Sequence, residues 1–267
     1  MTSTRRALLL SALVAGIVAA PAGATRAQAL DEPLDPQIGS ESMVLPPGAD
    51  RFKTPQRFAV EVRFGPYLPD VDSEFDGARH PYRDFFGTSQ HLLSQIEFDY
   101  ELFHRFGTIA LGASYGYFSV SGKAPVANGG GATSNDLSTM TVMPLSVSAI
   151  YRFDVFLERS RFPLVPFVKG GFDWAYWSIT DGNDSIATDA TGGKGRGGTL
   201  GWHGAAGLQL VLDFFDWESA RSFDADMGVN HTSLVFQYTY ADISGLGRPD
   251  RMHLGDANWS LGIMFQF

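Results

Sequence analysis

The chain has 267 residues, among them 30 Gly, 21 Phe and no Cys, and its formal net charge is −9 at pH 7. The absence of Cys excludes a disulfide scaffold, a thiolate metal site, a Cys nucleophile and a lipid anchor on an N-terminal Cys. The acidic balance argues against a nucleic-acid partner, because proteins that bind nucleic acid concentrate Lys and Arg.

Residues 1–29 have the features of a secretory signal peptide. Arg5 and Arg6 form a positively charged start, and an apolar stretch follows from Ala7 to Ala20. The segment 27–29, Ala-Gln-Ala, is a small-x-small pattern, so we predict cleavage after Ala29. An uncleaved membrane anchor is the alternative, but the apolar run is short for a spanning helix.

Residues 30–57 are rich in Pro and acidic residues and show no periodicity. We predict that they form a disordered periplasmic lead-in. No later stretch approaches about 18 consecutive apolar residues, so we predict no transmembrane helix. An exported chain of this kind is either a soluble periplasmic protein or a β-barrel.

From Phe58 onward the pattern changes to an alternation with a period of two, which is typical of β-strands. In the first segment the apolar Phe58, Val60 and Val62 alternate with Ala59 and Glu61. The pattern recurs in eight segments of about ten residues, namely 58–65, 95–102, 109–117, 145–153, 168–176, 202–212, 233–240 and 258–267.

Four features of the sequence favour a membrane barrel over a soluble β-sandwich. Ten residues cross a bilayer at a tilt, and bacterial barrels have even strand numbers. The second face carries Gly, Ala, Ser and charged residues, which suits a crowded interior. Long connections alternate with shorter ones. We therefore predict an all-β fold, an eight-stranded antiparallel transmembrane β-barrel over residues 58–267.

Aromatic residues gather at the predicted strand ends, where amphipathic rings favour the membrane interface. The predicted outer girdle contains Tyr67, Tyr117, Trp174, Tyr176, Trp202, Tyr240 and Trp259. The predicted inner girdle contains Phe58, Phe103, Phe153, Phe214 and Phe267. Two such girdles are typical of outer-membrane barrels.

The final segment ends the chain with apolar residues at every second position, namely Trp259, Leu261, Ile263, Phe265 and Phe267. With this motif, residues 58–267 resemble small outer-membrane β-barrel proteins of the OmpA-like barrel group. Within that group they look closest to an uncharacterised myxobacterial-type family of outer-membrane barrels. The resemblance implies that these five residues are an assembly signal, and that the barrel-assembly machinery is a transient partner.

The inward-facing positions of the predicted strands carry charged side chains. They are Glu61, Arg63, Glu97, Asp99, Glu101, Arg152, Lys169, Asp173 and His203. An eight-stranded barrel is just wide enough for its own side chains to fill it, so we predict a polar network that plugs the lumen. The alternative is a narrow ion path, in which the surplus of acids favours cations.

Other motifs give weaker indications of chemistry. His231 and Ser233 resemble the His-x-Ser of outer-membrane lipid A deacylases, in which His is the base and Ser the nucleophile. The glycine-rich segment 191–198 fails the P-loop spacing, but its Lys194 and Arg196 suit lipopolysaccharide phosphates. Residues 224–228 hold only a fragment of a calcium loop. We predict no catalytic residues, no cofactor and no metal.

These features together predict a non-enzymatic outer-membrane protein of a Gram-negative cell envelope, with a structural or surface-interaction role. We expect a monomer that contacts outer-membrane lipid and lipopolysaccharide. The alternative function is a porin-like narrow channel or small-solute pore. A third possibility is a lipid-modifying membrane enzyme.

Overall fold

The structure is a computed structural model that describes residues 57–75, 77–125, 133–155, 157, 163–188, 192–214, 229–248 and 251–267. The predicted signal peptide, the lead-in up to residue 56 and the calcium-loop fragment at 224–228 lie outside these residues. No helix in the described part of the chain is long and apolar enough to cross a membrane.

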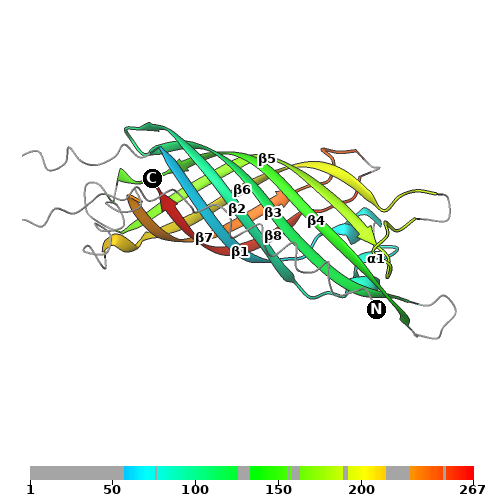
Figure 1. Ribbon diagram of the computed structural model, residues 1–267. Coiled ribbons are helices and arrows are strands. Elements are labelled where there is room, and N and C mark those ends of the chain that lie inside the picture. The colour runs from blue at the N-terminus through cyan, green and yellow to red at the C-terminus, as the bar shows by residue number, and fades with distance from the viewer. Residues whose placement is uncertain are drawn as a thin grey trace, which may run out of the picture. The chain divides into compact units, whose positions relative to one another are not determined.

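Eight antiparallel strands form a closed barrel in which each strand pairs with its neighbours in the sequence (Figure 1). The strands are β1 (Phe58–Tyr67), β2 (His91–His104), β3 (Thr108–Pro125), β4 (Thr133–Arg152), β5 (Leu164–Thr180), β6 (Arg196–Val211), β7 (His231–Asp242) and β8 (Asp256–Gln266). The predicted fold class is therefore confirmed.

Strand β8 closes the barrel by pairing with both β7 and β1. Ile263 lies opposite Val62 on one side and opposite Leu234 on the other. The backbone N–H of Phe267 donates to the carbonyl of Phe58 at 2.8 Å, which extends the seam to the last residue. Closure leaves no strand edge with unpaired backbone groups, and this is the condition for crossing a bilayer with strands.

The alternation puts apolar side chains on the outside of the barrel and polar ones inside. Val147 and Phe172 are 63% and 69% exposed, whereas the charged Glu97 and Asp99 are 1% and 2% exposed. In a water-soluble fold this distribution would be reversed, because apolar burial drives folding and buried charges are costly. The outside of the barrel therefore faces lipid.

Several strands are longer than the ten residues expected from the sequence. Strands β3, β4, β5 and β6 have 18, 20, 17 and 16 residues. Beyond Tyr117 the two faces of β3 exchange character, because Phe118 and Val120 are buried while Ser119 and Ser121 point outward. The alternation continues with its apolar residues on the inner face, so these strands continue past the membrane into water.

The connection between β1 and β2 is structured. It contains a 3-10 helix, η2 (Val71–Phe75), and a short helix, α1 (Pro81–Phe86), at the barrel end opposite the C-terminus (Figure 1). The Asp72 carboxylate accepts the N–H groups of Tyr82 and Arg83 at 2.7 and 3.2 Å, which satisfies donors that a helix start leaves free. The helix packs on β3, where a Cβ on Gly122 would meet the carbonyl oxygen of Phe85 at 2.0 Å.

The predicted outer girdle is largely on the lipid side. Trp174, Trp202, Tyr240 and Trp259 are 42–52% exposed, and the Trp202 and Tyr240 rings lie 5.7 Å apart. Tyr67 was wrongly placed in this girdle. It points inward, is 6% exposed, and its hydroxyl donates to the Leu254 carbonyl at 2.6 Å. Tyr67 lies at the end of β1, near the membrane interface. It is an even number of residues from Glu61 and Arg63, so it faces the lumen as they do.

Candidate functional site: the lumen and the pocket at the long-loop end

All nine side chains assigned to the lumen from the sequence point into the barrel and are at most 9% exposed. They are Glu61, Arg63, Glu97, Asp99, Glu101, Arg152, Lys169, Asp173 and His203. The strand register divides them into three clusters that lie at successive levels of the lumen.

The first cluster is a quartet of two acids and two bases, with a formal charge of zero. Glu61 and Glu97 lie directly opposite each other on β1 and β2, a pairing that is unfavourable between like charges. Arg63 forms ion pairs with both carboxylates, at 3.3 Å from Glu61. Lys169 also reaches both, at 3.0 Å from Glu97 and 3.4 Å from Glu61. The two cations therefore neutralise the repulsion between the acids.

Lys169 reaches this quartet from the other side of the barrel. It lies on β5, whereas its partners lie on β1 and β2, three or four strands away around the ring. Its ion pairs therefore cross the lumen rather than run along the wall. A side chain bridge of this kind occupies the space that a conducting path would need.

The second cluster lies nearer the end of the barrel that holds the C-terminus. Arg152 on β4 pairs with Asp99 and, at 3.3 Å, with Glu101, both on β2. Glu101 also accepts a hydrogen bond from the Gln266 amide at 3.2 Å and lies 3.2 Å from His104 Nε2. These contacts join β2, β4 and β8 across the interior.

The third cluster contains two serines that sequence reasoning missed. Nδ1 of His203 lies 2.9 Å from Asp173, and its Nε2 lies 3.0 Å from the Ser148 hydroxyl. The Ser146 hydroxyl donates to Asp173. The sequence indicates only that these serines face inward, because they alternate with the apolar residues of β4. Their partners lie on β5 and β6 and are distant in the sequence. The hydrogen-bonded chain from Ser148 through His203 to Asp173 has the connectivity of an acyl-transfer triad.

An apolar cluster fills the lumen beyond these charges. It lies at the barrel end that carries the β1–β2 and β7–β8 connections, which we call the long-loop end. We call the cluster the apolar plug. Its members come from seven strands or their ends and from both short helices, and they include Phe118, Met140 and Leu254, which are at most 1% exposed. Its buried residues are Tyr67, Val71, Tyr82, Leu93, Phe118, Val120, Met140, Val142, Ala175, Ile243 and Leu254. Between the plug and the charges a cavity of about 60 Å³ remains.

The weaker motifs do not assemble into sites. His231 contacts Asp213, and Ser233 accepts a hydrogen bond from Gln209 at 3.0 Å, so each is held by a different partner. Lys194 is exposed near the start of β6. Among the residues that the structure describes, no group of three His, Cys, Asp or Glu side chains could hold a metal ion.

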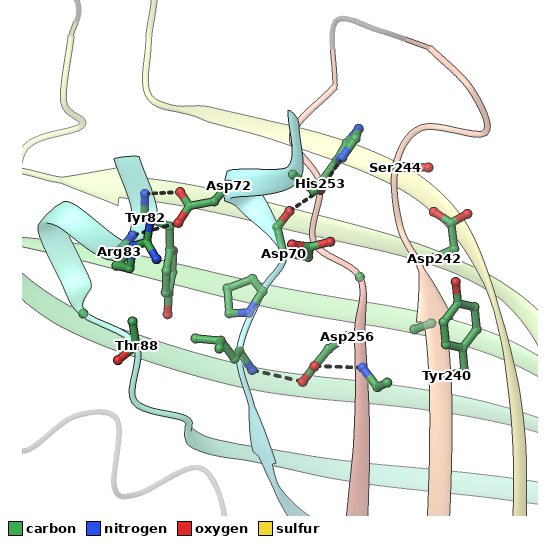
Figure 2. Close-up of a pocket in the computed structure, with 17 residues that line it drawn as sticks. Asp70, Asp72, Tyr82, Arg83, Thr88, Tyr240, Asp242, Ser244, His253 and Asp256 are labelled. Carbon is green, nitrogen blue, oxygen red and sulfur yellow. Dashed lines mark hydrogen bonds between the residues drawn. The ribbon is translucent and has the colours of Figure 1, made fainter. Parts of the chain in front are cut away.

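A second feature that the sequence did not indicate is a pocket of about 500 Å³ at the long-loop end (Figure 2). We call it the rim pocket. It lies between the η2–α1 connection and the chain that joins β7 to β8, and two contacts hold these segments together. Ser73 Oγ lies 2.8 Å from His253 Nδ1, and the Asp70 N–H donates to the Gly255 carbonyl at 3.0 Å. These contacts fix the two walls of the pocket relative to each other at the mouth of the barrel.

The closed eight-strand ring, the lipid-facing apolar belt and the polar lumen define a small transmembrane β-barrel of the outer-membrane type. Comparison with solved structures gives Neisserial surface protein A at a TM-score of 0.43 and 13% identity, over 79% of this chain and 97% of that chain. OprG from Pseudomonas aeruginosa gives 0.42 and 12%, over 79% and 96%. Ail of Yersinia pestis gives 0.37 and 8%, over 79% and 97%. No protein-family model and no curated protein matches the sequence.

Proposed function

We propose that this protein is a closed, non-conducting β-barrel of the outer membrane that serves the cell envelope as a structural element and through its long-loop surface. The proposal is carried by the ion pairs from Lys169 to Glu61 and Glu97, which cross the lumen. An ion passing this level would have to break pairs that are buried. Removing a partner from a buried pair costs about 3–5 kcal/mol, a barrier that argues against a resting pore.

The apolar plug is the second support for a closed lumen. Its buried residues come from seven of the eight strands or their ends, and Val71 of η2 and Tyr82 of α1 belong to it. Hydrated ions and small polar solutes are excluded from apolar packing, because they would lose water contacts without gaining partners. The two barriers lie in series, at different levels of the barrel.

We further propose export with cleavage after Ala29, and insertion with the long connections outside. The outward face of the barrel supports the proposal that lipopolysaccharide surrounds the protein. Above the aromatic girdle the outward positions form a row of hydroxyls, with Ser119, Thr141 and Ser178 side by side on β3, β4 and β5, and Arg196 next to Ser178 on β6. Hydroxyls and an exposed guanidinium suit sugar and phosphate groups.

The proposed partner during insertion is the barrel-assembly machinery. Its proposed signal lies on the outward side of β8, where the first three of the five residues are 43–52% exposed. These residues are Trp259, Leu261, Ile263, Phe265 and Phe267. Removing the last aromatic side chain by Phe267→Ala should lower the yield of inserted barrel in cells. The same variant should leave the stability of protein refolded in vitro nearly unchanged.

We propose that the protein is not an enzyme, although Ser148, His203 and Asp173 are hydrogen-bonded in the manner of a catalytic triad. The neighbouring cavity of about 60 Å³ is far below the roughly 300–1,000 Å³ of typical ligand sites. Ser148 itself is only 4% exposed. A fluorophosphonate probe, which labels activated serines, should leave the folded protein unmodified. Labelling that disappears in Ser148→Ala would establish a catalytic serine instead.

Single-channel recording tests the closed lumen. The chain of residues 30–267, refolded into a planar bilayer, should show no discrete conductance steps although heat-dependent gel mobility proves that it is folded. The matched variant neutralises Glu97, Asp99 and Glu101 to the corresponding amides. Cation-selective steps in the wild-type chain that vanish in this variant would establish the narrow pore and overturn the proposal.

A further inference from the structure

The rim pocket is strongly acidic. Its lining contains four aspartates and one arginine, Arg83. The aspartates are Asp70, Asp72, Asp242 and Asp256. Carboxylates around a concave surface with low-dielectric walls concentrate a negative potential, which attracts cations from the medium.

Two of the four carboxylates already have partners within the protein. Asp72 accepts the N–H groups at the start of α1. Asp256 accepts the Leu68 N–H at 3.0 Å and the Ala257 N–H at 2.7 Å. These two aspartates therefore hold the pocket walls in place, and their charge adds to the field.

The other two carboxylates are uncommitted. Neither Asp70 nor Asp242 has a side-chain hydrogen bond or ion pair with any residue that the structure describes. Asp70 lies on the connection from β1 to η2, and Asp242 lies at the end of β7, so the two come from different walls (Figure 2). A ligand that contacts both must span the pocket.

A buried hydroxyl also lacks a partner at this site. Tyr82 lines the pocket and is 4% exposed, and its hydroxyl forms no hydrogen bond within the described structure. Figure 2 shows the ring between Asp72 and Thr88, with the hydroxyl directed away from Asp72. Burial, with the charges of Asp72 and Asp256, raises the pKa of Tyr82 to about 12, so the group stays protonated. A buried hydroxyl without a partner is costly, and a polar ligand would satisfy it.

The arrangement does not favour one metal ion as the shared ligand. In the described part of the chain no three acidic or His side chains converge closely enough to coordinate an ion. The separate carboxylates instead suit a cation whose charges are spread along its length. A volume of about 500 Å³ is that of a site for a small organic molecule.

We propose that the rim pocket binds a small organic cation with two or more amino groups, of the size of a linear polyamine. Ammonium groups pair with Asp70 and Asp242, and the Tyr82 hydroxyl accepts or donates a hydrogen bond to the ligand. Arg83 opposes binding through its charge. The inference deepens the proposed function, since it rests on the long-loop end facing the medium and assigns a ligand class to that surface.

The test is calorimetric titration of spermidine into the full chain folded in micelles of a zwitterionic detergent. Asp70→Asn and Asp242→Asn should each weaken binding by about tenfold, the usual effect of losing a charged hydrogen bond. Asp184→Asn is the matched control, because Asp184 is exposed on the β5–β6 connection and Asn tolerates its φ of 58°. It removes the same charge and should leave binding unchanged.

Two further variants test the remaining groups. Arg83→Gln should strengthen spermidine binding, and weaker binding in this variant would overturn the assignment of a purely cationic ligand. Tyr82→Phe should weaken binding without lowering stability, and unchanged affinity would remove the hydroxyl from the site. Equal affinities in wild type, Asp70→Asn and Asp242→Asn would overturn the proposal, as would undetectable binding. Titration of Mg²⁺ alone should give no heat that depends on Asp70, and such heat would identify a metal site instead.

This titration is independent of the lumen. A barrel that conducts in a planar bilayer and still binds spermidine through Asp242 would refute the closed-lumen function while leaving the pocket assignment intact. A silent barrel that fails to bind would refute the pocket assignment alone.

Discussion

Removing Lys169 tests whether each buried carboxylate in the first lumen cluster depends on a buried cation for its stability. Its ammonium lies 3.0 Å from Glu97 and 3.4 Å from Glu61, and it is 7% exposed. Lys169→Met keeps most of the side-chain volume and leaves two buried carboxylates against the single charge of Arg63. An uncompensated buried charge costs about 3–5 kcal/mol, so we expect a loss of this size in the free energy of unfolding. Urea unfolding of the barrel in lipid vesicles, followed by Trp fluorescence, measures it.

A second substitution separates charge balance from packing. Adding Glu97→Gln to Lys169→Met returns the quartet to zero formal charge, so the double variant should be more stable than Lys169→Met alone. The coupling should amount to about 0.5–3 kcal/mol. Lys123→Met serves as control, since Lys123 is exposed on β3 and its loss should change stability by no more than about 0.5 kcal/mol. If Lys169→Met costs no more than Lys123→Met, the lumen is hydrated and the reasoning for a closed barrel is wrong.

Three other substitutions test the rest of the architecture. Val147→Arg places a charge on the lipid face and should destabilise the inserted barrel by about 2–4 kcal/mol, measured by the same unfolding assay; a neutral effect would contradict the membrane assignment. Asp72→Ala removes the acceptor for the first N–H groups of α1 and should cost about 1 kcal/mol, with faster proteolysis of the β1–β2 connection in the folded barrel. Gly122→Ala drives a Cβ against the Phe85 carbonyl and should release α1 to protease, whereas Gly204→Ala, which has open space at its Cβ, should not; equal protection in both variants would show that α1 is not held against β3.

The side of the barrel on which each residue lies could be predicted because parity is a local property of a strand. Once Val60 was assigned to the lipid, Glu61 had to face the lumen, and the same reasoning placed Glu97. The partner of Lys169 could not be predicted in this way, because the pair depends on which strands face each other across the closed ring. The helix α1 was missed because its six residues are too few for a helical period to show.

The ends of the long strands were missed for a different reason. The alternation of β3 does not stop at Tyr117, but its apolar residues move from the outward to the inward positions at Phe118. A search for a continuous outward apolar face therefore ends at this point. The exchange recurs on β5, where Trp174 faces outward and, three residues later, Trp177 packs against the plug. It marks the depth at which the medium outside the barrel changes from lipid to water.

The same exchange accounts for both barriers of the closed lumen that we propose. At membrane depth the lipid takes the apolar face, so the interior is polar, and a narrow polar interior must pair its own charges as Lys169 and Glu97 do. Beyond the membrane water surrounds the barrel, so the apolar face turns inward and packs as in a soluble protein, with Phe118 and Met140 almost fully buried. The plug is thus the ordinary hydrophobic core of the part of the barrel that stands in water. Because η2 and α1 complete this core, the chain cannot open its lumen at the long-loop end without exposing apolar side chains. The connection that seals the barrel also forms a wall of the rim pocket, which places any ligand of that pocket on the outer side of the seal.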